Sequence, residues 1–439
     1  MSDTRPSAGP RRSRRRLQLA TVGALVLVGA VVAGLLLFWS QGPDELPRPE
    51  PMFPPVTGVV IRVAPDGTGA GDTNSWSDAA SLDQLPRILA KAEPGTQVWL
   101  RADAGSYLVN RPIPVRRGGT ADAPIVIRGV DSDGEPQAAD IVGDRADPYD
   151  PAGAKGNEVF RLLGGANHLV FQELGFRNIG NGAFRIGADV TDLTIRQITA
   201  TNVRRFIENN ASGETPTATI SGLTVTNVTV EGYSRGVARL QYDSNRILFD
   251  GVRGDSEGQD LDPFAMGIHL SDTVHDVDIR NTSMLNSVST KGNYWNGDGF
   301  TAEKMTYDIR FDNTYSAGHT DAGYDLKSRA AILTRAVAAD SKRNFRFFGN
   351  ITVDGCTGID PHLRGGTGTQ TQVHATSAAV VSMTRCTFED SDAQTIVFDV
   401  DGTARFTVTD STVVYAPEAR LKTVEPGGHL EQAETVKVN

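Results

Sequence analysis

The sequence of 439 residues contains little cysteine and has no excess of positive charge. Its two cysteines, Cys356 and Cys386, are too few for a disulfide framework or a cysteine-rich zinc module. The formal net charge of −10 argues against nucleic acid as the main ligand. Hydrophobic residues make up 39% of the chain, which excludes a protein that is disordered over its whole length. With 46 glycines and 22 prolines, the composition is typical of many short strands joined by turns rather than of a helical bundle.

The N-terminus differs from the rest of the chain in charge. Residues 1–16 contain six arginines, and residues 17–39 contain an uncharged run from Leu19 to Trp39, long enough to cross a bilayer. The positive-inside rule then predicts a cytoplasmic tail at 1–16, a transmembrane signal anchor at 17–39 and an extracellular remainder. A cleaved signal peptide is the rival interpretation, but its apolar run should be shorter and an A-x-A-like site should follow. Residues 40–56 include six prolines and predict a semi-rigid linker.

Short strand-like segments recur along the body of the chain. Each alternates apolar and polar residues, as a strand with one buried face should. The segments follow one another at a nearly regular spacing, and the step from Thr314 to Cys356 is the longest. The residues at the sixth position of the nine segments are Leu174, Ile198, Val228, Val252, Thr282, Thr314, Cys356, Cys386 and Ser411. A repeat that cannot bury its own inner face must stack on its neighbours, which is typical of a solenoid.

We therefore predict an all-β fold, a right-handed single-stranded parallel β-helix over residues 57–425, preceded by one N-terminal transmembrane helix. A helix starting after Ser81, with Leu82, Leu85 and Ile88 on one face, should cover the N-terminal end of the stack. The long step before Cys356 predicts an inserted loop within 328–349. Residues 426–439 are expected to form a C-terminal tail. Cys356 and Cys386 fall in one column, either as two small buried residues or as a disulfide between adjacent coils.

A second column of strands carries charged residues. If its apolar residues point inward, one outward file contains Arg185, Arg239, His269, Thr301 and Asp325, and Glu208 and Arg364 extend it. Charged side chains stacked about 4.8 Å apart on a flat sheet form a groove for an extended polymer. We expect Arg185, Arg239, His269, Glu303 and Lys327 to bind the substrate, although isolated surface charge is the alternative for Lys327.

Three aspartates form the densest acidic cluster. Asp298 lies in NGDGF, and Asp321 and Asp325 lie in HTDAGYD, about one coil later. Carboxylates from adjacent coils are hard oxygen ligands that suit Ca²⁺. The alternative is that they are turn aspartates bound to backbone N–H groups.

These motifs resemble those of family 9 polysaccharide lyases, which include pectate lyases. The resemblance implies a β-helix with calcium bound by the aspartates, and a catalytic base in the strand HLRGG (362–366). Two departures from the family pattern are Ala322, at the place of a calcium ligand, and Arg364, at the place of the catalytic lysine. This resemblance implies β-elimination on a uronate-containing polysaccharide, with Arg364 as the base. His362 is the other candidate base, and it comes from the motif described next.

A second resemblance concerns residues 360–362, Asp-Pro-His, which are similar to the D-P-H motif of mannuronan C5-epimerases. There the order of the D-P-H and D-G-F strands is reversed relative to this chain. The hypotheses are therefore a lyase-like enzyme on an anionic polysaccharide, an epimerase-like enzyme, or a non-catalytic glycan-binding surface protein. A polygalacturonase-type hydrolase is disfavoured because the chain has no Asp-Asp pair. We expect a monomer that binds no nucleic acid.

Overall fold

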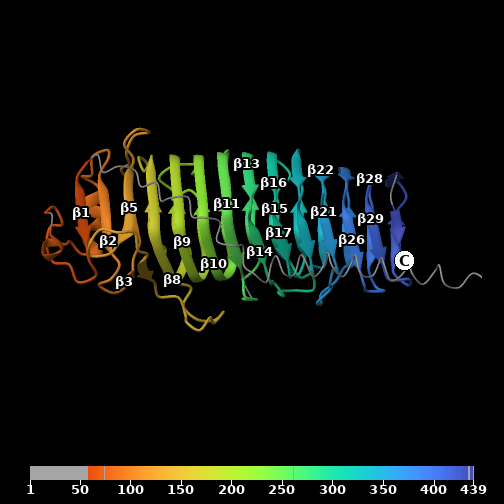
Figure 1. Cartoon of the computed structure of the whole chain (residues 1–439), viewed down its shortest axis with the longest axis horizontal. Coiled ribbons are helices and arrows are strands. Elements are labelled where there is room, and N and C mark those ends of the chain that lie inside the picture. Colours follow the sequence, from red (N-terminus) through yellow and green to blue (C-terminus); the bar gives the residue numbers. More distant parts are fainter. Residues whose placement is uncertain (1–57, 74, 261, 434–435, 439) are drawn as a thin grey trace, which may run out of the picture. The chain divides into compact units, whose positions relative to one another are not determined.

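A computed structural model describes residues 58–73, 75–260, 262–433 and 436–438, and these residues form a parallel β-solenoid of about 12 turns. Figure 1 shows the strands standing side by side along the stack, in chain order from one end to the other. The all-β parallel solenoid predicted from the repeats is confirmed. The predicted anchor at 17–39 and its flanking segments lie outside the described residues. Within the described residues, none of the helices is long and apolar enough to cross a membrane.

The coils build three parallel sheets, and each described strand pairs with its counterpart in a neighbouring coil. Strands β8 (Leu169–Ile186), β9 (Val190–Asn209) and β10 (Ile220–Leu240) continue through all three sheets. The first sheet also contains β1 (Val60–Val63), β2 (Gln97–Arg101), β5 (Ile125–Val130), β11 (Asn245–Asp255), β13 (His275–Arg280), β16 (Tyr307–Asp312), β19 (Ala331–Thr334), β22 (Asn350–Asp354), β25 (Val380–Thr384), β28 (Arg405–Thr409) and β31 (His429–Ala433).

The second and third sheets are built from shorter strands. The second contains β3 (Tyr107–Leu108), β6 (Ala139–Val142), β14 (Ser283–Leu285), β17 (Tyr315–Ala317), β20 (Val337–Ala339), β23 (Thr357–Ile359), β26 (Thr387–Asp390), β29 (Thr412–Tyr415) and β32 (Val436–Val438), with the end of β11. The third contains β4 (Ile113–Val115), β7 (Phe160–Leu162), β12 (Ala265–Leu270), β15 (Gly297–Ala302), β18 (Ala322–Leu326), β21 (Arg343–Phe347), β24 (Thr371–Ala375), β27 (Ile396–Val400) and β30 (Arg420–Val424).

The corner between the first and second sheets explains the column of sixth residues. The residue before each of them has a left-handed backbone, with φ from +49° to +69°, which turns the chain from one sheet into the next. Asparagine, aspartate and glycine, the residues that adopt this conformation most easily, hold more than half of these positions. Together with the equivalent residue directly after β19, the corner residues are Glu173, Gln197, Asn227, Gly251, Asn281, Asn313, Arg335, Gly355, Arg385 and Asp410.

The long step from Thr314 to Cys356 contains an extra coil rather than the predicted inserted loop. Tyr315 pairs with Val337, and Val337 pairs with Thr357, so two short coils follow one another. Strands β19, β20 and β21 occupy most of the region 328–349. The repeat was missed there because the short strand AILT carries little of the alternating pattern on which the prediction depended.

The two ends of the solenoid differ in part from the predictions. The N-terminal cap consists of a 3₁₀ turn, η2 (Leu82–Gln84), followed by the helix α2 (Leu85–Leu89). Its predicted apolar face is buried, but the Ser81 side chain makes no capping hydrogen bond. At the other end, β31 and β32 pair with β28 and β29, so the solenoid continues past residue 425, where the sequence predicted a tail.

Apolar side chains from the three sheets fill the interior. Phe300, Tyr324 and Phe345 come from consecutive rungs of the third sheet and stack with centroids 5.1 and 5.3 Å apart. Each ring is fully buried, which stabilises the fold by roughly 2 kcal/mol per side chain. The structure joins Cys356 and Cys386, both buried, in a disulfide between adjacent coils. Of the two alternatives for these cysteines, the disulfide is the one found.

Candidate functional site

The outer face of the third sheet carries one continuous file of polar residues. Its members alternate with buried apolar neighbours such as Phe300 and Ala302, so the file points away from the core. The register places the following residues on successive rungs: Arg161, Arg185, Glu208, Arg239, His269, Thr301, Asp325, Arg346, His374 and Asp399. The register therefore confirms the expected file, whose predicted members were Arg185, Glu208, Arg239, His269, Thr301 and Asp325.

Arg364 does not extend this file. Arg346 takes that place, paired in register with Asp325 on one side and His374 on the other. The guanidinium of Arg364 instead binds Asp340, both at its carboxylate and at its backbone oxygen. Asp340 also lies 3.4 Å from Nδ1 of His362, a side chain that is 60% exposed. The structure therefore places both predicted bases beside Asp340, and neither of them lines the pocket described next.

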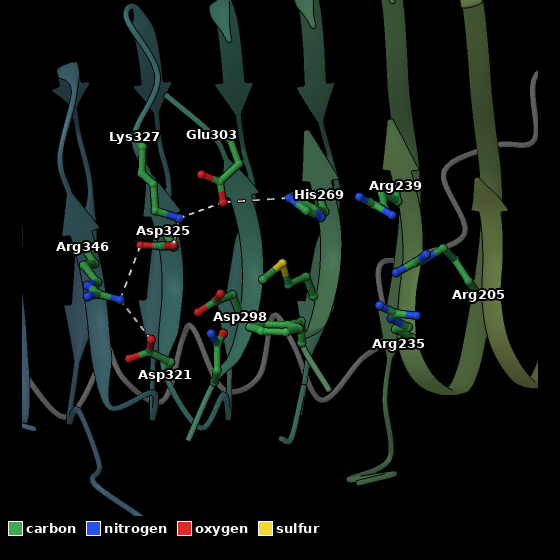
Figure 2. Close-up of a pocket in the computed structure, with 13 residues that line it drawn as sticks. Arg205, Arg235, Arg239, His269, Asp298, Glu303, Asp321, Asp325, Lys327 and Arg346 are labelled. Carbon is green, nitrogen blue, oxygen red and sulfur yellow. Dashed lines mark hydrogen bonds and ion pairs between the residues drawn. The ribbon is translucent and has the colours of Figure 1, made fainter. Parts of the chain in front are cut away.

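A polar pocket of about 390 Å³ opens over the middle of the file. In Figure 2, arginines stand at one side of the pocket, His269 in the middle, and carboxylates with Lys327 and Arg346 at the other side. The thirteen lining residues are Arg205, Arg235, Arg239, Phe264, Met266, His269, Asn296, Asp298, Glu303, Asp321, Asp325, Lys327 and Arg346. All three predicted metal ligands and four of the five predicted substrate-binding residues line it, and Arg185 lies next to it along the file.

Glu208 organises the arginine side of the pocket. This carboxylate is 2% exposed and binds Arg185 and Arg205, with Nη1 of Arg239 at 3.4 Å. Burial alone would raise the pKa of Glu208, but the arginines outweigh it and lower the pKa. Burial also lowers the pKa of Arg205 to about 9, so this arginine stays charged at neutral pH. The Nε atoms of Arg205 and Arg235 have no hydrogen-bond partner among the described residues.

His269 lies between the two sides of the pocket. Its side chain is 16% exposed, and its Nε2 lies 3.9 Å from Glu303 Oε1. Burial, together with the neighbouring cations Arg239 and Arg205, lowers the pKa of His269 to about 3. The imidazole is therefore neutral at physiological pH and able to accept a proton.

Buried carboxylates form the opposite side. Asp298 Oδ1 accepts a hydrogen bond of 2.9 Å from the N–H of Ala322. Burial and the nearby carboxylates of Asp325 and Asp321 raise the pKa of Asp298 well above its usual range. Lys327 binds Asp325 at 2.7 Å and Glu303 at 2.9 Å. Since its pKa is raised so far, Asp298 is the residue of this group best suited to hold a proton.

Asp321 is already saturated with donors. Its Oδ1 accepts from Lys342 at 3.0 Å and from Arg343 at 2.9 Å, and its Oδ2 accepts from Arg346 at 3.0 Å. The Tyr294 hydroxyl donates to the same carboxylate, 2.8 Å from Oδ1 and 2.7 Å from Oδ2. Three positive charges therefore surround one carboxylate.

These contacts do not fit the predicted calcium site. A hard cation needs several oxygen ligands with free lone pairs, and both oxygens of Asp321 are occupied by cationic donors. Asp325 is bound to Lys327, and Asp298 is the carboxylate that burial most favours in its protonated form. Among the described residues, no group of three or more His, Cys, Asp or Glu side chains is arranged to hold a metal ion.

Phe264 adds an apolar element to the pocket. It is 54% exposed and has a left-handed backbone, with φ of +61°. Polar contacts hold the loop that carries it: buried Asp262 accepts from Ser234 at 2.5 Å, and half-buried Asp260 accepts from the N–H of Thr290 at 2.9 Å. Fixed loop contacts therefore keep a large aromatic ring at the mouth of a charged pocket.

Sequence reasoning missed six of the thirteen lining residues, and it also missed Lys342, which contacts Asp321. Arg346 and Lys342 fell inside the region taken as a loop. Arg235 lies within an irregularity of β10, where the register shifts between Tyr233 and Gly236, and a pattern of one residue per coil gives no signal for it. The other four missed residues, Arg205, Phe264, Met266 and Asn296, belong to segments whose pattern shows only a strand or a loop.

No family profile matches the chain, and no curated protein matches it. Solved structures do match. Pectate lyase Pel9A is 15% identical with a TM-score of 0.39, over 74% of this chain and 77% of that chain. The A-module of the mannuronan C-5 epimerase AlgE6 of Azotobacter vinelandii is 12% identical with a TM-score of 0.42, over 78% and 91%. The gp42 tailspike of Acinetobacter phage vb_AbaP_AS12 is 8% identical with a TM-score of 0.44, over 86% and 62%.

The two protein classes that the motifs resembled, pectate lyases and mannuronan epimerases, are thus both represented among the structural matches. All of these identities and TM-scores are low, and the matched proteins differ in activity. We therefore base the function on the site of this chain.

Proposed function

We propose that this protein binds an acidic polysaccharide along the outer face of the third sheet and cleaves it by β-elimination in the pocket. The observation that carries the proposal is the position of a neutral histidine, His269, between three arginines and a carboxyl group with a raised pKa. This combination supplies the three functions that elimination from a uronate requires.

Elimination begins with removal of the proton at C5 of the uronate, which is acidic only when the adjacent carboxylate is neutralised. Arg205, Arg235 and Arg239 provide fixed positive charge for that carboxylate. A ring nitrogen of His269 takes the C5 proton, and binding of the anionic substrate offsets the arginine charge that lowers the pKa of this histidine. The C4–O4 bond then breaks, a C4–C5 double bond forms, and the proton of Asp298 passes to O4.

The file of polar residues supports a polymer rather than a single sugar as substrate. The rungs are spaced about 4.8 Å apart, and charged or polar groups extend beyond the pocket in both directions, from Arg161 to Asp399. An extended acidic chain can therefore contact Arg185 on one side of the pocket and Arg346 on the other. The exposed ring of Phe264 offers an apolar surface for the face of a sugar ring.

An assay of the full chain on polygalacturonate, alginate and glycosaminoglycans tests this proposal. We expect ultraviolet absorbance of an unsaturated uronide on one of these polymers. His269→Gln should lower kcat at least about 100-fold, as expected for loss of a general base. His275→Gln is the matched control, because His275 stacks on Tyr307 on the first sheet, away from the pocket.

Other outcomes distinguish the remaining hypotheses. If no ultraviolet absorbance appears but NMR of the polymer shows inverted stereochemistry at C5, the reaction is epimerisation instead of elimination. In that reaction a proton returns to C5. Binding without any chemical change would make the protein a glycan-binding β-solenoid. Loss of activity in Arg364→Ala and His362→Gln, with activity retained in His269→Gln, would return the base to the residues that the motifs implied.

We also propose that the chain is anchored by residues 17–39, with its β-solenoid outside the cytoplasm. The arginines before the uncharged run and the disulfide Cys356–Cys386, which suits an oxidising compartment, support this location. Protease added to intact cells should degrade the solenoid; protection from protease until lysis would contradict the proposed orientation.

A further inference from the structure

A fully buried lysine lies beside Asp321, where the motifs implied a calcium ion. The Lys342 side chain is 0% exposed, and its Nζ lies 3.0 Å from Asp321 Oδ1. The backbone oxygens of Trp295 and Thr367 each lie 3.4 Å from the same nitrogen. The ring of Tyr294 covers it, with its centroid 3.8 Å away.

The groups around this nitrogen are those that hold a cation. One carboxylate oxygen and two backbone carbonyl oxygens are typical ligands of a hard metal ion, and an aromatic face also attracts positive charge. A lysine ammonium brings three donors and no acceptor, so each oxygen can receive one of its N–H groups. We propose that Lys342 is a built-in cation, whose ammonium takes the position of a metal ion at Asp321 and ties together the loops around it.

The position of Lys342 in the chain explains how it joins these loops. It directly precedes β21, one rung after Asp321, whose backbone oxygen accepts the N–H of Arg343 at 2.9 Å. Trp295 belongs to the loop that precedes β15 and carries the pocket residue Asn296. Thr367 belongs to the loop that precedes β24. One ammonium therefore links segments from rungs β15, β18 and β24.

A second contact joins the same two loops. The N–H of Thr367 donates to the backbone oxygen of Asn293 at 3.0 Å, and Gly366 lies against the Trp295 ring. A Cβ at Gly366 would come within 2.9 Å of Trp295 Cγ, and the backbone there is left-handed, with φ of +70°. The two glycines of HLRGG, which the resemblance connected with a catalytic strand, thus allow the loops to pack closely.

The local charge opposes an additional metal ion. Lys342, Arg343 and Arg346 all contact Asp321, so the cluster carries more positive than negative charge before any metal arrives. A divalent cation next to this carboxylate would have to displace Lys342 or be repelled by it.

Calcium titration of the purified full chain tests the proposal without any substrate, so its result is independent of the proposed function. Isothermal titration with CaCl₂ should show no stoichiometric binding by the wild type, and melting temperatures in calcium and in EDTA should agree. Lys342→Ala should melt lower than the wild type in EDTA and should regain part of the loss in calcium, because an ion can then occupy the vacated position. Lys304→Ala, at an exposed lysine, is the control and should behave as the wild type.

Stoichiometric calcium binding by the wild type that Asp321→Asn abolishes would overturn the proposal. So would a Lys342→Ala variant that is as stable as the wild type and gains no response to calcium. If Lys342→Ala does not fold, Lys342→Gln keeps a donor without the charge and should show the same calcium response, while the wild-type titration remains decisive on its own.

Discussion

His269 shows how neighbouring groups determine the chemistry of one side chain. It has the same residue type as the exposed His362, yet burial and the charges of Arg239 and Arg205 keep it neutral. The pKa of the Asp298 carboxyl group is raised by the complementary effect, burial among other carboxylates. A pattern of residue types shows neither effect, because both arise from residues that are distant in the sequence.

The lowered pKa of His269 predicts a specific pH dependence of stability. An unfolded histidine binds a proton below about pH 6.5, whereas the folded pKa is about 3, so protonation favours unfolding between these values. This contribution is complete above pH 6.5 and is lost as the pH falls towards 3. His269→Gln should therefore lose less stability than the wild type between pH 7.5 and pH 5, by on the order of 1–2 kcal/mol. Equal losses in thermal melts of the two proteins would contradict a neutral, buried His269.

Phe264 predicts an effect on binding with little effect on folding. Because the ring is 54% exposed, Phe264→Ala should change the free energy of unfolding by less than about 0.5 kcal/mol. Loss of a stacking surface should raise KM for the polymer about 2- to 10-fold, while Phe264→Trp should preserve it. Leu108→Ala, at an 81% exposed residue outside the pocket, is the control for surface truncation. An unchanged KM in Phe264→Ala would remove this ring from the binding surface.

The corners between sheets are the element-scale feature that shapes the solenoid. From the coil of β8 to the coil of β28, the chain turns from the first to the second sheet through a left-handed residue, and the column of buried sixth residues follows directly after it. The sequence pattern was sufficient to locate this column. The alternation of apolar and polar residues fixes the register of each strand, because a shift by one residue would expose its apolar side chains. It did not reveal the coil of β19 to β21, which is shorter than the coils before it and carries a weaker pattern.

Gly355 allows the backbone requirement of such a corner to be measured. Its φ is +69°, and a Cβ built there would meet nothing within 4 Å, so a substitution changes the backbone preference without a steric clash. Gly355→Val should lower the free energy of unfolding by about 1–2 kcal/mol, and Gly355→Asn by clearly less, because asparagine tolerates this conformation. Urea denaturation of the three proteins provides the comparison. Equal stability of the valine and asparagine variants would show that the corner is not strained.

Irregularities limit how much of the site the sequence can reveal at this scale. Most of the file followed from counting residues along regular strands. The register shifts in β8, between Asn181 and Phe184, and in β10, between Tyr233 and Gly236, insert residues that such counting passes over. Arg235 enters the pocket through the second of these shifts, so its contribution becomes visible only with the backbone in place.

At the scale of the whole molecule, a disulfide reinforces the stacking of coils. Cys356 and Cys386 are 30 residues apart and buried, so the bond closes one full coil onto the next. Replacement of both by alanine should lower the free energy of unfolding by about 2–4 kcal/mol. Reductant should lower the free energy of unfolding of the wild type by the same amount in denaturation experiments. It should not change the free energy of unfolding of the double variant. Two free thiols in the oxidised protein, detected by alkylation and mass spectrometry, would contradict the bond.

The cluster around Lys342 has a consequence for how the molecule comes apart. In a solenoid each coil normally contacts only its two neighbours, so coils can detach one after another from an end. Here the carboxylate of Asp321 and the ammonium of Lys342, together with Tyr294 and Thr367, connect the rungs of β15, β18, β21 and β24. A pulling force or a denaturant that reaches this region should release these coils together, as one cooperative block in an otherwise stepwise unravelling.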